Sequence, residues 1–590
     1  MLIGIPALLL AVVVLYFVSP NIRHMVSRNV KSISVNDSLV NNTMSTAELS
    51  LPSDKVSTKT MPKVTLIGYA WNAAAPWTVA NGGINTTEGS LMESAGVSLQ
   101  IVKQNDLDKI RNAQLLALKE FNENQIYPAT GAVGVLIMGD GGPYYTSTTQ
   151  QQIDKIYGVG KYHVKSVAAS GVSYGEDKLI GPVAWKLNPQ LLRGALIAAV
   201  IGDGDWVVAV NYCAQLGIPV NPDPTTYDKN AANFIQAEES DYIKSASMLV
   251  KCQKTNFKYS LKLMKNGKRT NKDTLVGING CATWFPGDKN VFDVLPGYTD
   301  IISTRVYNNQ MACSLIIIDE WAKANAAVFE NMLAAMYTAG NQIKLYDSWL
   351  VKACECNSKV FMLQDGPYWY KAFNSYTGHD ANNIEYSIGG TRAFNYADAE
   401  QYYGLNGGAS RYEAVYTQIA GYLDTLNPMG YKENVSATIP YADAVNLEYL
   451  QAIKSKLATG TAYTPKTTTT TTVLAKADYK VNFVTGSAVI DATGLAIVKK
   501  IYGANAFSED TKINIIGHTD NVGDPAFNLS LSIKRAEAVK QALIDLGFSS
   551  TRFNIVTGKG DTSPLPGNTN ATEAERYQNR RVEITVLNTK

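Results

Sequence analysis

The sequence is poor in the two residues on which most metal and disulfide chemistry depends. It contains four histidines and six cysteines in 590 residues. The histidines share no metal-binding spacing and form no HExxH motif, so we expect no metal site. No nucleophile–base pair can be assembled from them, so we also expect no catalytic residues and no enzyme activity. The cysteines are too few for a disulfide scaffold; their even number permits bridges but does not assign partners.

A surplus of either charge is also missing. Lys and Arg total 53 against 51 Asp and Glu, which leaves a net charge of +2 and no general attraction to nucleic acid. Hydrophobic residues make up 46% and charged residues 18%, an ordinary globular balance. At about 150 residues per domain, the length predicts two to four domains. No cofactor is indicated.

One uninterrupted apolar run opens the chain. Residues 2–18 carry no charge, and their length is at the short end for a membrane-spanning helix. A cleaved secretory signal is the alternative, but a basic start and a small-x-small cleavage site are lacking. We therefore expect an uncleaved anchor at residues 1–20. Arg23, Arg28 and Lys31 would keep the following chain cytoplasmic by the positive-inside rule, and this conflicts with the C-terminal unit described below.

Two stretches of biased composition divide the rest. Residues 21–61 include a Ser-, Asn- and Thr-rich segment without periodicity, which predicts a tether. Thr464-Pro465-Lys466 and the threonines 467–472 predict a linker over 456–475. Two folded units remain, 62–455 and 476–590.

The larger unit alternates strand-like and helix-like segments. Residues 64–68, 133–138 and 314–319 are short apolar strands, and 107–122 repeats apolar residues at helical spacing. This alternation predicts an α/β fold with mainly parallel sheets, arranged as two lobes with a cleft, because nearly 400 residues is large for one sheet.

Glycine-rich turns of the larger unit carry polar and aromatic side chains suited to a ligand cleft. The candidate solute-binding residues are Trp71, Asn72, Asp205, Trp284, Asp288, Ser303 and Thr304. Acidic residues here would oppose a bare phosphate. The Gly-rich turn at 139–142 lacks the Lys-Ser/Thr of a nucleotide loop.

The smaller unit contains the most specific motifs. Residues 479–490 and 513–516 predict strands, apolar residues at 531, 536, 539, 543 and 546 mark the buried face of a helix, and 580–586 predicts a final strand. The FVTGS opening at 483–487, the GHTDNVG turn at 517–523, the helix with Asn528 and Arg535, and the Asn579–Val582 segment occur in that order.

These motifs resemble the OmpA-like peptidoglycan-binding family over the whole unit. The resemblance implies an α+β domain that captures the stem peptide of peptidoglycan, chiefly its diaminopimelate residue. Diaminopimelate presents an ammonium and a carboxylate, so a site needs one fixed anion and one fixed cation. Asp520 would accept the ammonium, Arg535 would bind the carboxylate, and Asn528 and Arg581 would support the peptide backbone.

The larger unit resembles type II periplasmic solute-binding proteins of the kind fused to OmpA-like domains. The resemblance implies two α/β lobes, a hinge, and closure around a small solute, which the sequence does not identify.

Together these features predict a periplasmic protein that is anchored to the inner membrane by its N-terminal helix, holds peptidoglycan and binds a small solute. A purely structural spacer between membrane and wall is the alternative. A stator subunit of an ion-driven motor is less favoured, because residues 2–18 lack the carboxylate that carries the proton.

Overall fold

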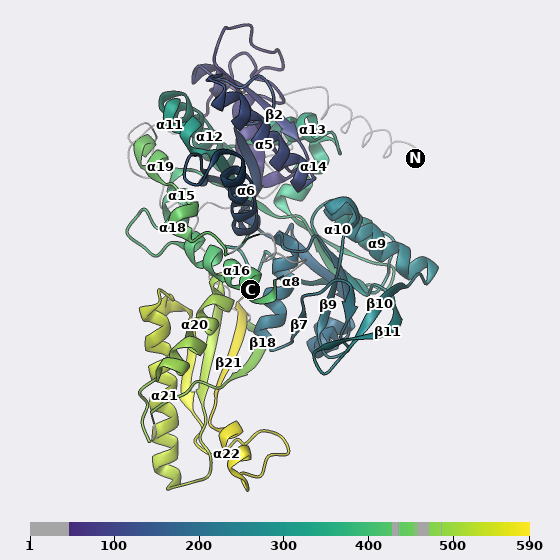
Figure 1. Cartoon of the computed structure of the whole chain (residues 1–590), viewed down its shortest axis with the longest axis vertical. Helices are drawn as coiled ribbons and strands as arrows, with labels where there is room; N and C mark the ends of the chain where they lie inside the picture. Colours follow the sequence, from purple (N-terminus) through teal and green to yellow (C-terminus); the bar gives the residue numbers. More distant parts are fainter. Residues whose placement is uncertain are drawn as a thin grey trace, which may run out of the picture.

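The computed structural model describes residues 47–427, 435, 437–454, 457, 471–484 and 486–589. Three bodies are visible in Figure 1: an upper lobe, a second lobe beside the centre, and a smaller C-terminal unit below. We call the first two lobe 1 (47–173 and 312–454) and lobe 2 (178–303).

Lobe 1 is built on a six-stranded sheet of order β17-β4-β14-β3-β1-β2. Its strands are β1 (Lys63–Gly68), β2 (Ser98–Lys103), β3 (Gly134–Met138), β4 (Val164–Ser173), β14 (Ala312–Ile318) and β17 (Thr391–Ala393). The helices around it are η2 (Asn72–Ala74), α3 (Ala75–Asn81), α4 (Leu91–Ser94), α5 (Leu107–Asn122), η3 (Gly139–Gly141), α6 (Gly142–Tyr157), α11 (Asp319–Ala324), α12 (Ala326–Leu345), α13 (Asp347–Phe361), α14 (Gly366–Asn374), α15 (Tyr396–Tyr403), α16 (Arg411–Leu426), α18 (Tyr441–Ala444) and α19 (Glu448–Ile453). Strands β3 and β14 are buried along their whole length, as expected for a sheet covered on both faces.

Lobe 2 repeats the plan with a sheet of order β13-β5-β12-β6-β9-β7. Its strands are β5 (Lys178–Pro182), β6 (Leu196–Ala199), β7 (Val220–Asn221), β9 (Ala232–Gln236), β12 (Gly280–Thr283) and β13 (Tyr298–Ser303), and a small outer sheet is formed by β8 (Thr226–Tyr227), β10 (Tyr259–Lys265) and β11 (Lys268–Val276). Its helices are α7 (Ala184–Leu187), η4 (Pro189–Leu192), α8 (Gly204–Gln215), η5 (Glu238–Ser240), α9 (Tyr242–Thr255) and α10 (Gly287–Phe292). A hairpin from the lobe 1 chain, β15 (Tyr376–His379) with β16 (Glu385–Ile388), packs on lobe 2, where the Tyr386 ring stacks on Phe292 at 4.5 Å.

The two lobes are joined by two crossover segments, which we call the hinge segments. Residues 174–177 lead from β4 to β5, and residues 304–311 lead back from β13 to β14. Because β4 leaves lobe 1 and β14 returns to it, β14 runs antiparallel to both β3 and β4. The sheets are therefore mixed and not mainly parallel, which corrects that part of the fold prediction.

The C-terminal unit is a four-stranded sheet of order β18-β21-β19-β20. Its elements are β18 (Thr471–Tyr479), α20 (Ala492–Ala506), β19 (Thr511–Gly517), α21 (Pro525–Asp545), η8 (Ser550–Arg552), β20 (Phe553–Gly558), α22 (Glu573–Asn579) and β21 (Val582–Thr589). The helix predicted from its apolar spacing is α21, and Ala536, Val539 and Leu543 form its buried face.

The C-terminal unit docks on the hinge and on both lobes (Figure 1). The backbone N–H of Asn309, in the second hinge segment, donates to Phe507 O at 3.0 Å. From lobe 2, Gln215 of α8 donates to Ala504 O at 2.8 Å. From lobe 1, Arg411 of α16 forms an ion pair with Glu509. The unit is thus held against the hinge by contacts with three separate parts of the chain.

Some sequence predictions differ from the structure. The strand predicted at 479–490 is wrong: β18 occupies that place in the sheet earlier in the chain, and among residues 480–484 and 486–490 the only pairing is a single bridge between Phe483 and Ile490. Strand β18 begins inside the predicted linker, because threonine is β-branched and suits a strand. Residues 47–61 do not continue the tether but lie on lobe 1, where the Trp349 indole donates to Leu49 O at 3.1 Å.

The predicted anchor at residues 1–20 lies outside the described residues. In the part of the chain that the structure describes, every helix is too short or too polar to cross a bilayer.

Two glycines in helices give a matched test of the packing in lobe 1. A Cβ added at Gly340 of α12 would lie 1.8 Å from Phe394 O, whereas one added at Gly421 of α16 meets no atom within 4 Å. We expect Gly340→Ala to lower the free energy of unfolding by about 1–3 kcal/mol. Gly421→Ala should raise it by up to about 1 kcal/mol through better helix propensity. Urea unfolding followed by circular dichroism measures both, and equal effects of the two substitutions would contradict the packing described.

Candidate functional site

Two groups of side chains carry the candidate chemistry, one in the C-terminal unit and one between the lobes. In the C-terminal unit, Asp520 follows the end of β19 and is 9% exposed. Its Oδ1 accepts the backbone N–H of Val522 at 3.0 Å, which fixes the turn. Its Oδ2 accepts from Arg580 Nη1 at 2.5 Å. Asp520 is therefore a fixed anion whose partner is a half-buried arginine.

Arg535 lies on α21 near this carboxylate. Its Nε donates to Ser487 O at 3.2 Å, and its guanidinium lies 4.9 Å from the centre of the Phe483 ring. Within the described residues, the Nη groups of its fork have no acceptor. Burial and the nearby Arg580 lower the pKa of Arg535, while Asp520 opposes this shift. The arrangement leaves a positioned cation able to bind a carboxylate with two parallel hydrogen bonds.

The two predicted supporting residues occupy different positions. Asn528 Nδ2 donates to Asp520 O at 3.3 Å and to Val522 O at 3.1 Å, so it holds the turn that carries Asp520. Arg581 instead pairs with Asp478 of β18, Nε to Oδ1 at 3.0 Å. The structure thus places Asp520, Asn528 and Arg535 together, and shows Arg580, which the sequence reasoning missed, paired with Asp520.

Between the lobes, the carboxyl ends of several strands bring four buried aspartates into one region, which we call the carboxyl cluster. It comprises Asp140 after β3, Asp177 in the first hinge segment, and Asp203 and Asp205 after β6. The lobes meet closely here: a Cβ on Gly141 of lobe 1 would lie 2.0 Å from Asp203 Oδ1 of lobe 2. Strand ends across a cleft are where α/β folds commonly place ligands.

Asp203 directly connects the lobes. Its Oδ2 accepts from the phenol of Tyr69, at the end of β1 in lobe 1, at 3.0 Å, and also from Tyr242 of lobe 2. The rings of Tyr69 and Tyr242 pack against Trp284. Desolvation raises the pKa of Asp203, although these phenol hydrogen bonds oppose it.

The other members of the carboxyl cluster have few donors. When Asp177 and Asp205 are ionised, none of their four oxygens has a partner among the described residues. Burial raises the pKa of Asp177 to about 7, and a hydrogen bond with Ser173, the charge of Lys178 and a hydrogen bond with Asp205 oppose the increase. Burial and the neighbouring Asp177 raise the pKa of Asp205 well above its usual value. A proton shared by the two carboxyls is the simplest way to hold them together.

A buried lysine is the nearest fixed cation. Lys178 forms an ion pair with Asp288, and both side chains are fully buried. Desolvation raises the pKa of Asp288, and the attraction of Lys178 opposes the increase. Lys178 is therefore already paired with Asp288, and acidic side chains outnumber basic ones around the carboxyl cluster.

The predicted solute-binding residues fall into two sets. Asp205, Asp288 and Trp284 line the region between the lobes. The others are buried within the fold: Asn72 Nδ2 donates to Glu176 Oε1 at 3.0 Å, and Thr304 Oγ1 accepts the N–H of Gly175 at 2.9 Å.

The remaining two predicted residues are also buried. Ser303 Oγ accepts the N–H of Arg305 at 3.3 Å, and the buried Trp71 indole N–H has no acceptor in the described chain. A binding role for the seven residues stays a prediction.

The seven candidates did not include Tyr69, Asp140, Asp177, Tyr242 or Gln310. Asp140 lies in the glycine-rich turn at 139–142, which we rejected as a nucleotide-binding loop because it lacks the lysine of such loops. Asp177 and Gln310 lie in the hinge segments, which no local pattern marks as crossovers.

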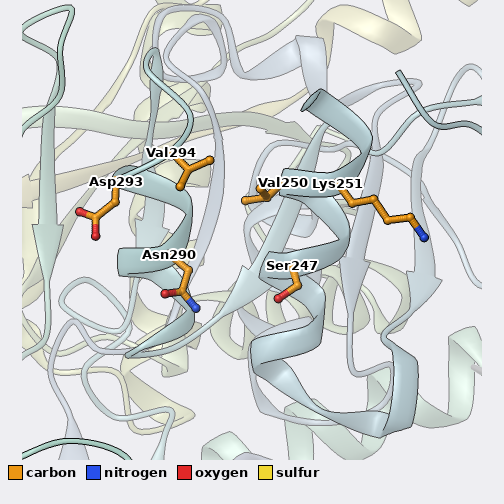
Figure 2. A pocket seen from close by; sticks show the side chains of 6 residues that line it. All are labelled: Ser247, Val250, Lys251, Asn290, Asp293 and Val294. Carbon is orange, nitrogen blue, oxygen red and sulfur yellow. The ribbon is translucent and has the colours of Figure 1, made fainter. Parts of the chain in front are cut away.

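A pocket of about 400 Å³ lies elsewhere, between α9 and α10 on lobe 2 (Figure 2). Figure 2 shows Val250 and Val294 turned toward each other across it, while Asp293 and Lys251 point away. Its polar groups do not converge, so it does not have the form of a specific binding site.

Comparisons with known proteins identify the C-terminal unit. Residues 482–580 match the OmpA family. Outer membrane porin F of Pseudomonas fluorescens is 36% identical over 111 residues, which are 19% of this chain and 33% of the porin. The peptidoglycan-associated lipoprotein from Burkholderia pseudomallei is 29% identical over 18% of this chain and 87% of that chain, with a TM-score of 0.17. The resemblance of the C-terminal unit to OmpA-like domains is thereby confirmed.

A second likeness covers a larger share of the chain. The periplasmic nitrate-binding protein NrtA from Synechocystis PCC 6803 covers 67% of this chain and 89% of its own, at 13% identity and a TM-score of 0.43. The chain spans 33% and 39% of the first two curated relatives that it matches.

The raised pKa of Asp177 predicts an unusual pH dependence of stability. The folded protein keeps a proton on this carboxyl that the unfolded chain releases, so the contribution is present below about pH 4 and is lost as the pH rises through about 7. Asp177→Asn should make the fall in unfolding free energy between those values less steep, by up to about 1.4 kcal/mol per pH unit. Urea unfolding across this range measures it, with Asp293→Asn on the outer surface of lobe 2 as control. Parallel curves for Asp177→Asn and the parent would contradict the assignment.

Proposed function

We propose that the OmpA-like domain binds the stem peptide of peptidoglycan, through its diaminopimelate residue. The observation that carries the proposal is the placement of Asp520 and Arg535 at one end of β19, a fixed anion near a fixed cation. The family match to residues 482–580 supports it. A side chain that presents an ammonium and a carboxylate would bind these two groups at once.

The environment of each charged group fits this task. Asp520 is held by the Val522 N–H and paired with Arg580, so an incoming ammonium would replace or share that partner. Arg535 is held by Ser487 O and the Phe483 ring, which leaves its Nη fork for the carboxylate. Little side-chain order is then lost on binding, because both groups are already positioned.

The site faces away from the rest of the chain. Strand β19 starts just after the residues that dock on the hinge and ends just before Asp520. Its length separates the two ends by roughly 20 Å. A polymer bound at Asp520 would therefore meet the outer end of the domain.

We infer for the whole chain a location in the cell envelope, on the periplasmic side. The OmpA-like domain supports this location, and residues 1–20 would supply an anchor in the inner membrane. The proposed role is binding and not catalysis.

For the two lobes, we propose binding of a small solute between them. The two hinge segments and the convergence of strand ends from both lobes support this role, because lobes joined in this way can separate and close. The buried polar groups without partners mark the region where a solute would be held.

A structural spacer is the second candidate. It is favoured by the direct contacts that already close the lobes, in which Tyr69 of lobe 1 donates to Asp203 of lobe 2 and Gln310 donates to Asp140. In this role the lobes would stay closed and set the distance between membrane and wall.

Co-sedimentation with purified sacculi tests the first proposal. We expect Asp520→Asn and Arg535→Leu each to weaken binding by at least about tenfold, because each leaves one charge of the ligand unpaired. Arg535→Lys should be intermediate, since it keeps the charge but loses the fork. Glu537→Gln, on the exposed side of α21, is the matched control. Wild-type binding by both the Asp520 and the Arg535 variants would refute the site.

Native mass spectrometry of the purified full chain tests the second proposal. A solute-binding protein is expected to retain a discrete small mass that is lost on denaturation. A spacer would show the mass of the chain alone, and no small molecule would raise its melting temperature.

A further inference from the structure

The unpartnered atoms of the carboxyl cluster are all hydrogen-bond acceptors. In their ionised form, both oxygens of Asp177, both of Asp205, and Oδ1 of Asp140 are buried without a well-formed hydrogen bond from the described residues, although the Ser173 hydroxyl lies close enough to Asp177 to oppose the rise of its pKa. A ligand held here must therefore bring donors or positive charge. Nitrate brings only acceptors, and hydrogen phosphate brings few donors together with negative charge, so neither anion suits ionised carboxylates.

Gln310 provides an observation independent of the acids. It lies in the second hinge segment and is fully buried. Its Nε2 donates to Asp140 Oδ2 at 2.6 Å and to Gly204 O at 3.3 Å, so its amide group reaches into the carboxyl cluster. Its Oε1 has no partner in the described part of the chain. Gln310 is neutral, but its Oε1 is a hydrogen-bond acceptor like the carboxylate oxygens of the neighbouring aspartates.

The surroundings suit an organic cation. The Tyr69, Tyr242 and Trp284 rings border Asp203, and aromatic faces attract ammonium groups. Among the described residues, no group of three or more acidic, histidine or cysteine side chains is arranged to hold a metal ion. An ammonium group needs no such arrangement, because each of its three N–H donors can meet a separate acceptor.

We propose that Asp140, Asp177, Asp205 and Gln310 bind the ammonium group of a small cationic solute between the lobes. This inference rests on the proposed solute-binding function and specifies the class of solute. The ammonium takes the place of the proton that otherwise joins Asp177 to Asp205. The solute reaches the site when the lobes separate about the hinge segments, and closure of the lobes buries it.

Methylammonium, 1,4-diaminobutane, sodium nitrate and sodium phosphate are the probes, each added to the full chain at constant ionic strength. We expect the two amines to raise the melting temperature and the two anions to leave it unchanged. Asp205→Asn and Asp177→Asn should weaken amine binding by at least about tenfold. Asp293→Asn, in the outer pocket of Figure 2, should bind amines like the parent.

Calorimetry of the parent protein gives a second measurement that does not depend on the variants folding. Titration of methylammonium at about pH 6 in two buffers of different ionisation enthalpy should show release of about one proton per amine bound. The charged and titratable groups that face the Asp177–Asp205 pair are Asp140, Glu176, Lys178, Asp203, Tyr242, Cys281 and Asp288.

Failure of the ammonium site and failure of the proposed solute binding give different results. Any one of three results would overturn the ammonium site and leave a solute-binding protein of another specificity. These are binding of the anions but not the amines, unchanged amine binding in both Asn variants, and amine binding without proton release. If no probe binds and native mass spectrometry of the full chain shows no retained molecule, solute binding itself fails and the spacer is favoured.

Discussion

The arrangement of this protein depends on the pair of hinge segments that run side by side between the lobes. Thr304 ties them together: its Oγ1 lies 2.6 Å from Ser173 Oγ and accepts the Gly175 N–H, while its own N–H donates to Asp177 O at 3.0 Å. Because both segments are fixed at this point, the strand ends of lobe 1 face those of lobe 2. The carboxyl cluster, the aromatic rings beside it and the docking surface of the OmpA-like domain all follow from that geometry.

Burying so many carboxyl groups opposes folding unless each is protonated, paired or hydrogen-bonded. The region uses all three solutions. Asp288 is paired with Lys178, Asp203 accepts two phenol donors, and burial raises the pKa of Asp177 to about 7 beside Asp205, which favours a protonated carboxyl there. Of the three, the Asp177–Asp205 pair has neither a fixed cation nor a phenol as its partner, so a bound cation could replace its proton.

Local patterns in the sequence predicted what depends on local order. Helix α5 and strand β1 follow from apolar periodicity, and the OmpA-like motifs placed Asp520, Asn528 and Arg535 together because a strand end, a turn and one helix face fix them. The same reasoning assigned a strand to 479–490, since nothing local shows that Thr471–Tyr479 takes that position in the sheet. Arg580 was missed in favour of Arg581 because neighbouring residues point in different directions from the start of β21. Asp177 and Gln310 were not among the candidates, since they join the carboxyl cluster only when segments far apart in sequence cross between the lobes.

The docking of the OmpA-like domain on Asn309 has a mechanical consequence. A domain on a slack linker would transmit no load to the rest of the chain until the linker was fully extended. Here Phe507 and Glu509 contact the hinge and lobe 1 directly, and β19 connects this contact to the turn that carries Asp520. Tension applied at Asp520 therefore passes along one strand to the segment about which the lobes would move.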